Sequence, residues 1–168
     1  MGKATARQLL PGASVAEAER LWLDLARWSA FVDGFGTLAR HEGQWPQAET
    51  RIIWDSLRNG RGRVVENVVE HEPGATQLVR VEDPTLHGAQ RVRFTAYDGG
   101  CEISLELDYV LKQPGLGGRL TDLFFVRRSL SDALRRTLRR FAVELEADRA
   151  MQAESERPQP RSRNNKES

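Results

Sequence analysis

The amino-acid sequence predicts an α+β fold in which a curved antiparallel β-sheet of about seven strands wraps around a long C-terminal helix. Apolar residues recur at helical spacing from residue 116 to residue 148. The preceding part of the chain breaks into short alternating segments separated by Gly, Pro and Asn, which is typical of strands joined by hairpins. A helix of this length, about 50 Å at 1.5 Å per residue, has one apolar face to bury. A sheet with one apolar face is the surface that can receive it.

The C-terminal helix has a narrow apolar face with one charged residue in it. At 100° per residue, the large apolar residues fall on one side: Leu116, Leu120, Leu123, Leu130, Leu134, Leu138, Phe141 and Leu145. Arg127 lies along the centre of this face, where a guanidinium is costly unless it is paired or reaches solvent. Two interpretations stay open. Arg127 binds a ligand carboxylate or enolate at the floor of a cavity, or it extends past the face to solvent or to an acidic partner such as Asp108.

The N-terminal part predicts a strand followed by two short helices. Residues 3–10 form the strand, which ends at Pro11. Ser14 and Glu17 form a capping box that begins the first helix. A second helical segment covers residues 28–35.

Six further strands are predicted between the short helices and the long one. They cover residues 37–41, 50–57, 63–71, 76–81, 90–97 and 101–111. The links between them include the turn sequences Asn59-Gly60, Pro73-Gly74 and Asp98-Gly99-Gly100. Because such short links reverse the chain, neighbouring strands are expected to be antiparallel.

Composition narrows the class of protein. The chain has 25 basic and 24 acidic residues and a net charge of +1, so no overall potential attracts nucleic acid or an anionic membrane. No stretch approaches about 20 consecutive apolar residues, so neither export nor membrane insertion is predicted. The single cysteine, Cys101, excludes an internal disulfide and is consistent with a reducing cytoplasm. His41 and His87 have no carboxylate or cysteine at metal-ligand spacing, so neither a metal nor another cofactor is predicted.

Four segments resemble a known superfamily. They are residues 13–17 leading to Leu21-Trp22, residues 25–31, residues 62–70 and the closing helix. The sequence resembles the START-like superfamily, also called SRPBCC, whose fold is the helix-grip fold, and within it the bacterial polyketide cyclase/dehydrase-type proteins. The likeness covers residues 3–148. It implies one ligand-binding domain over residues 1–150, and residues 151–168, which have almost nothing to bury, are predicted to be a disordered tail.

The resemblance implies a pocket for a hydrophobic or aromatic small molecule between the sheet and the helix. Members of the superfamily range from lipid and hormone carriers to aromatic-ring cyclases, which hold a polyketide chain with an arginine and aromatic hydroxyls. Where such an arginine would be expected, near the end of the strand 63–71, this sequence has Glu70, His71 and Glu72. That difference lowers the support for an enzyme.

Large aromatic side chains are the candidates for the pocket wall, because they suit a flat or chain-like apolar ligand. Together with Leu105 and Arg127, the predicted ligand-binding residues are Trp22, Trp28, Phe31, Trp54, Phe94, Tyr109 and Phe124. The alternative for each aromatic residue is an ordinary place in the core.

The candidate catalytic groups are Arg127, Tyr109, Asn67 and His71. Asn67 and His71 lie on the same side of their strand, where an amide or a neutral imidazole holds or moves a proton on a carbonyl ligand. The alternative for His71 is an exposed position at the end of the strand.

Three functions follow, in order of preference. The first is a binding protein for a hydrophobic or aromatic small molecule, lipid-like or polyketide-like. The second is a polyketide cyclase/dehydratase-type enzyme. The third is an interaction module that uses the arginines on the other side of the long helix, although acidic residues interleaved with them favour an ordinary solvated face. The ligand and the oligomeric state stay open.

Overall fold

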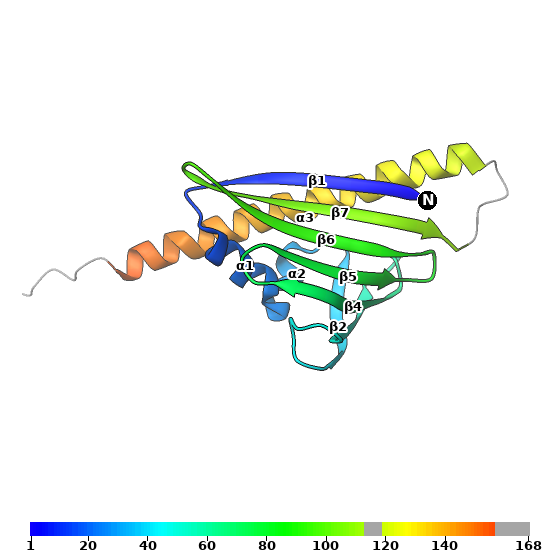
Figure 1. Cartoon of the computed structure of the whole chain (residues 1–168), viewed down its shortest axis with the longest axis horizontal. Coiled ribbons are helices and arrows are strands. Elements are labelled where there is room, and N and C mark those ends of the chain that lie inside the picture. Colours follow the sequence, from blue (N-terminus) through cyan, green and yellow to red (C-terminus); the bar gives the residue numbers. More distant parts are fainter. Residues whose placement is uncertain (113–118, 157–168) are drawn as a thin grey trace, which may run out of the picture.

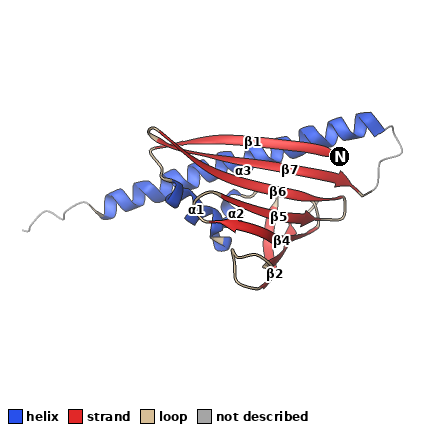
Figure 2. Cartoon of the chain, in the orientation of Figure 1, coloured by secondary structure: helices blue, strands red, loops and turns tan. Residues whose placement is uncertain are grey.

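The computed structural model describes residues 1–112 and 119–156, with side chains described over residues 1–112 and 125–156. The seven strands are β1 (Gly2–Pro11), β2 (Phe35–Glu42), β3 (Arg51–Ser56), β4 (Arg63–Glu72), β5 (Thr76–Glu82), β6 (Leu86–Tyr97) and β7 (Gly100–Leu111). The helices are α1 (Val15–Leu23), a single 3-10 turn (Leu25–Arg27), α2 (Trp28–Phe31) and α3 (Arg119–Ser155). The predicted α+β helix-grip class is confirmed (Figure 2).

All seven strands form one antiparallel sheet in the order β1-β7-β6-β5-β4-β3-β2. The six later strands follow one another as a meander, and β1 adds to β7 with Gly2 opposite Tyr109 and Pro11 opposite Gly100. The two edge strands of the sheet are β1 and β2, and both come from the first quarter of the chain. Figure 1 shows α3 lying behind the sheet, along β1 and β7.

The local signals at the start of α1 act as the sequence predicts. The Glu17 amide donates to Ser14 Oγ at 3.2 Å, and the Ser14 amide donates to Glu17 Oε2 at 2.7 Å. This reciprocal pair satisfies backbone donors that have no partner inside the helix. The second helical segment is shorter than predicted, because Gly34 at φ +76° directs the chain into β2 at Phe35.

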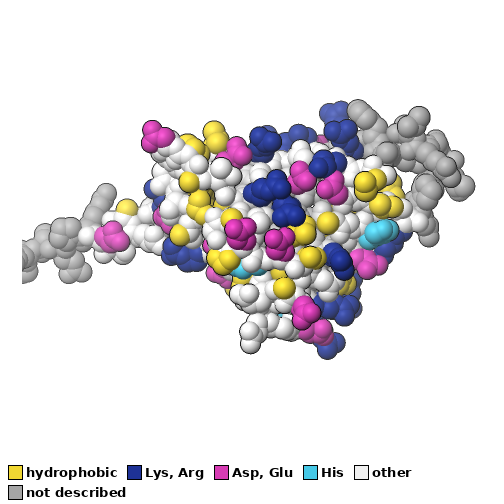
Figure 3. Space-filling model, in the orientation of Figure 1, with side chains coloured by type: hydrophobic (Ala, Val, Ile, Leu, Met, Phe, Trp, Pro, Cys, Tyr) yellow, Lys and Arg dark blue, Asp and Glu magenta, His cyan; other side chains and the backbone are white. Residues whose placement is uncertain are grey.

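The two faces of the sheet differ in polarity. The outer face carries both signs of charge, interspersed over the long strands (Figure 3), and Lys3 Nζ lies 3.0 Å from Glu106 Oε1 and 3.5 Å from Asp108 Oδ1. The inner face is apolar and packs against the helices. A core therefore lies only on the side that faces α3.

The long helix buries its predicted apolar face over part of its length. The buried residues on it are Leu134, Thr137, Leu138, Phe141 and Leu145. The helix continues to Ser155, so residues 151–155, predicted as part of a disordered tail, are helical with exposed side chains. Residues 157–168 and the predicted face from Leu116 to Leu123 lie outside the described residues or side chains.

Candidate ligand-binding site

A cavity of about 450 Å³ lies between the inner face of the sheet and the middle of α3. This volume falls within the range of about 300 to 1,000 Å³ that holds small organic ligands in proteins. Its apolar wall includes Trp22, Trp28, Trp54, Leu105, Leu107 and Leu134. The small side chains of Ser129 and Ala133 face the same space from α3, and they leave room that larger residues there would fill.

The tryptophans of the wall are held by their own packing and hydrogen bonds. The ring centroids of Trp22 and Trp28 are 6.4 Å apart, and Trp28 Nε1 donates to the Trp22 carbonyl at 2.9 Å. Trp54 stacks against Phe35 with a centroid separation of 5.3 Å. Because each ring is fixed from behind, the wall is largely preformed.

Glu66 places a carboxyl group in this apolar surrounding. Glu66 as a whole is 7% exposed. Its Oε1 accepts a hydrogen bond from Trp54 Nε1 at 2.9 Å. Burial raises the pKa of Glu66 above its ordinary value, and the Trp54 hydrogen bond and the positive charge of Arg61 oppose this effect only in part. Glu66 therefore tends to hold its proton.

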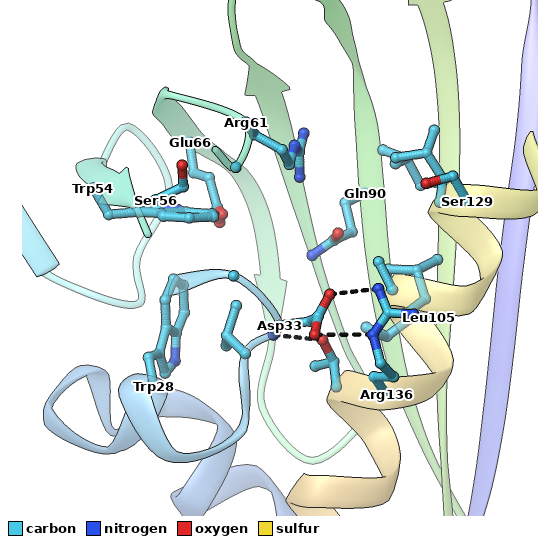
Figure 4. Close-up of a pocket in the computed structure, with 18 of the residues that line it drawn as sticks. Trp28, Asp33, Trp54, Ser56, Arg61, Glu66, Gln90, Leu105, Ser129 and Arg136 are labelled. Atoms are coloured by element: carbon cyan, nitrogen blue, oxygen red, sulfur yellow. Dashed lines mark hydrogen bonds and ion pairs between the residues drawn. The ribbon is translucent and has the colours of Figure 1, made fainter. Parts of the chain in front are cut away.

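Arg61 lines the cavity next to Glu66 (Figure 4), and Asp83 holds the guanidinium in place. Arg61 Nε donates to Asp83 Oδ2 at 2.6 Å. The Asp83 side chain is fully buried, and its Oδ1 accepts from Thr85 N, Thr85 Oγ1 and Leu86 N at 2.7, 2.7 and 2.9 Å. Burial alone would raise the pKa of Asp83, but the charge of Arg61 and these hydrogen bonds outweigh it, so the pKa lies below its ordinary value. Asp83 is thus an ionised anchor for Arg61.

Asp33 joins the rim of the cavity to α3. Arg136 Nε and Nη2 donate to its two carboxylate oxygens at 3.0 and 2.8 Å, and Arg140 Nη1 lies 3.2 Å from Oδ1. The Asp33 amide also donates to Thr137 Oγ1 at 2.9 Å. The segment between α2 and β2 is therefore tied to α3 where both border the cavity (Figure 4).

The structure brings four of the predicted ligand-binding residues to this cavity, namely Trp22, Trp28, Trp54 and Leu105. Phe31 and Phe94 are buried but do not line it. Phe31 packs instead against Phe141, with ring centroids 5.2 Å apart.

Tyr109 and Arg127 do not line the cavity. The Tyr109 ring covers Gly2, its Oη has no hydrogen-bond partner among the described residues, and burial raises its pKa while the charge of Arg127 opposes this. The Arg127 side chain is exposed, which favours the interpretation that it extends past the apolar face to solvent over the interpretation that it binds a ligand at the cavity floor. Val126 and Leu130 on the same stretch of α3 are partly buried against the core, so the helix is covered there on one side and the Arg127 side chain lies on the other. The side chain of Phe124 lies outside the described residues.

The two candidates on β4 are placed differently from the prediction. Glu66 and Val68 face inward, so Asn67 between them points to the outer face. A bulge between Val68 and Glu70 shifts the alternation, and the His71 side chain is only 6% exposed. His71 Nε2 lies 3.2 Å from Glu19 Oε1, so this histidine joins β4 to α1 instead of being exposed at the strand end.

Sequence reasoning missed the polar group of the cavity: Glu66, Arg61, Gln90, Asp33 and Arg136. For Glu66 the signal is ambiguous, because the stretch from Val64 to Val69 has valines on both faces of the strand, and only pairing with β3 and β5 decides which face is buried. Arg61 and Asp33 belong to loops, Gln90 lies in β6, and Arg136 is on a side of α3 that its sequence marks as solvated. Over residues 1–112 and 125–156, no three His, Cys, Asp or Glu side chains are grouped as metal ligands. None of the described helices is long and apolar enough to cross a membrane.

Solved structures share the fold. A protein from Thermus thermophilus is 21% identical with a TM-score of 0.70, over 87% of this chain and 98% of that one. A START superfamily protein from Mycobacterium smegmatis is 11% identical with a TM-score of 0.66, over 88% and 99%. The di-domain ARO/CYC StfQ from the steffimycin biosynthetic pathway is 16% identical with a TM-score of 0.68, over 88% of this chain and 52% of that one, so this chain spans about half of it.

Sequence comparison assigns the family. No curated protein matches the sequence significantly. The family model described as polyketide cyclase / dehydrase and lipid transport matches residues 1–146, which is nearly the whole folded part. Because the match covers most of the chain, it shows that the chain belongs to the polyketide cyclase/dehydrase and lipid transport family.

Proposed function

We propose that the protein binds a hydrophobic or aromatic small molecule, lipid-like or polyketide-like, in the cavity between α3 and the sheet. The observation that carries the proposal is a space of about 450 Å³ walled by three tryptophans and several leucines. An apolar ligand gains about 25 cal/mol for each Å² of apolar surface removed from water. Preformed walls of this kind reduce the ordering cost of binding.

A cavity-filling variant tests this proposal. Ala133→Phe puts a ring into the cavity from α3, whereas Ala147→Phe adds the same ring at an exposed position of the same helix. We expect oleyl alcohol, fluorene or fluorenone to raise the unfolding temperature of the wild type and of Ala147→Phe, but not of Ala133→Phe. A ligand at a hundred times its Kd adds about 2.7 kcal/mol to the free energy of unfolding, a shift of several degrees. If no compound stabilises the wild type, or if Ala133→Phe binds equally well, the proposal is wrong.

A second candidate function is catalysis of ring closure or dehydration on a ketone chain. Glu66 favours it, because a carboxyl that keeps its proton in an apolar cavity suits a general acid. The earlier candidates Arg127, Asn67 and His71 do not line the cavity, so Glu66 and Arg61 take their place in this proposal. If the protein is an enzyme of this kind, the wild type should convert a β-hydroxy ketone to the enone, as measured by mass spectrometry. Glu66→Gln should abolish this conversion and still bind the substrate. If the wild type converts no such substrate, the protein acts as a binder.

The interaction-module hypothesis has less support. Arg135 pairs with Asp132, and Arg136 and Arg140 both pair with Asp33, so much of the basic face is neutralised within the protein. Binding to DNA or anionic vesicles at low salt would restore this hypothesis.

A further inference from the structure

The cavity has one polar end, and its charges cancel within the protein. Glu66 and Arg61 line this end together with Gln90 (Figure 4). The positive charge of Arg61 is matched by the carboxylate of Asp83, at 2.6 Å from Arg61 Nε to Oδ2. Across the cavity, the carboxylate of Asp33 is likewise paired with Arg136.

The same end holds donors that are not fully used. Arg61 Nη2 is buried and has no hydrogen-bond partner among the described residues. The Glu66 carboxyl makes one hydrogen bond, to Trp54, through Oε1. In its protonated form, which the raised pKa favours, Glu66 also has a proton to donate. A buried donor without a partner is unfavourable, so a ligand acceptor that reaches it is favoured.

We propose that Glu66 and Arg61 determine ligand specificity by donating hydrogen bonds to an uncharged acceptor oxygen, such as a ketone, at this end of the cavity and by discriminating against a carboxylate. This rests on the proposed binding function and narrows its ligand class. A ketone oxygen takes the free donors without adding charge. A ligand carboxylate would bring a negative charge that Arg61, already neutralised by Asp83, does not compensate, and an uncompensated buried charge is strongly unfavourable.

Asp83 is the positioning residue in this arrangement. It holds the guanidinium through Nε, and the turn that carries Asp83 is fixed by its hydrogen bonds with Thr85 and Leu86. Removing the charge of Asp83 would free Arg61 to bind an anion. We therefore expect Asp83→Asn to gain affinity for a carboxylate ligand, a change that a purely structural role would not produce.

The specificity also depends on the protonation of Glu66. Below the pKa of Glu66 the acid donates to a ketone oxygen, and above it the carboxylate repels that oxygen. The charged groups that line the cavity with this carboxyl are Arg61, which is paired with Asp83, and the Asp33–Arg136 pair on the α3 side. Preference for a ketone should therefore decrease as the pH rises.

Three ligands of nearly the same shape test the proposal: fluorene, fluorenone and fluorene carboxylate. Calorimetric Kd values for the wild type should rank fluorenone about tenfold tighter than fluorene, as one hydrogen bond to a buried donor provides. Fluorene carboxylate should bind more weakly than fluorene. The ketone preference should fall in the wild type as the pH rises through the pKa of Glu66, which burial raises above its ordinary value. It should stay constant in Glu66→Gln, whose amide donates at every pH.

The possible outcomes separate this inference from the binding function. If none of the three compounds binds, the proposed binding of aromatic ligands fails and the inference falls with it. If all three bind with equal affinity, or if the carboxylate binds most tightly, the cavity stands and the specificity proposal is overturned. A ketone preference that falls with pH in Glu66→Gln as it does in the wild type would also overturn the role of Glu66.

Discussion

At the scale of single residues, Glu66 occupies a position where packing alone would favour an apolar side chain. Val64 and Val68, its neighbours on the same face of β4, are 0% and 4% exposed. The carboxyl has one hydrogen bond and a raised pKa caused mainly by burial. A group kept at such a cost to stability is a frequent mark of a functional site.

Glu66→Gln is expected to stabilise the protein at neutral pH. The folded state binds the Glu66 proton more tightly than the unfolded state, so this residue makes stability fall as pH rises from the ordinary glutamate value towards the raised pKa. The amide keeps the acceptor for Trp54 and has no charge to desolvate. The unfolding temperature should therefore rise by a few degrees at neutral pH, and the gain should shrink in acid.

Glu72→Gln is the matched control, because Glu72 lies on the same strand with an exposed side chain. Its unfolding temperature should stay close to that of the wild type. Equal or lower stability of Glu66→Gln at neutral pH would show that Glu66 is well accommodated, and the argument from its burial would fail.

Whether a single residue can be assigned to the cavity from sequence depends on its size and, in a strand, on which face of the sheet it points to. Trp22, Trp28 and Trp54 are large enough to be expected in any interior, and all three line the cavity. Glu66 and His71 depend on the phase of β4 and on its bulge, which arise from pairing with strands elsewhere in the chain. No local pattern contains that information.

At the scale of elements, α3 shows both the strength and the limit of periodicity. The apolar face from Leu134 to Leu145 follows the 3.6-residue repeat and is buried. The C-terminal end of α3 lies beyond the predicted one, because the sequence analysis interprets the polar composition after residue 150 as disorder. Residues 149–155 contain good helix formers such as Ala, Gln and Glu, and the next helix breaker is Pro158. A helix continues in such a stretch without burial.

Leu138→Ala should lower the free energy of unfolding by about 2 to 5 kcal/mol, because Leu138 is 1% exposed and the change leaves a space in the core. Val143→Ala on the same helix is the control, since Val143 is 64% exposed, and its effect should stay within about 0.5 kcal/mol. Denaturant unfolding measures both. Similar losses for the two variants would mean that α3 does not pack on the sheet through this face.

At the scale of the whole molecule, acid should destabilise the protein. Among the described residues, six carboxyl groups have a pKa below the ordinary value: Glu17, Asp55, Glu82, Asp83, Glu106 and Asp132. A lowered pKa stabilises the folded state above the ordinary value, and this stability is lost as the pH falls through the folded-state pKa. Glu66 acts in the opposite direction.

Denaturant unfolding measured at a series of pH values checks the combined effect of these carboxyl groups on stability. The free energy of unfolding should fall below about pH 5, and Asp83→Asn should reduce the fall because it removes the most buried of the six groups. A free energy that stays constant or rises in acid would contradict the prediction.

Some features of the whole fold follow from local sequence, and others depend on contacts between residues far apart in the chain. The meander from β2 to β7 was predictable because each turn is marked by nearby Gly, Pro or Asn. The cavity was not predictable from local sequence, because its size depends on the distance between α3 and the sheet. Small inward residues, Ala4 and Ala6, allow α3 to approach β1, and the space remains over the other strands.

The four tryptophans of the chain all gather at one place. Trp22, Trp28 and Trp54 line the cavity, and Trp45 packs against Trp28 with ring centroids 5.8 Å apart. Intrinsic fluorescence therefore reports on the cavity and carries little signal from the rest of the protein. Because the Trp54 indole donates to the Glu66 carboxyl, ionisation of Glu66 changes the field on that ring. A pH titration of the emission thus follows the buried acid directly, with neither ligand nor label.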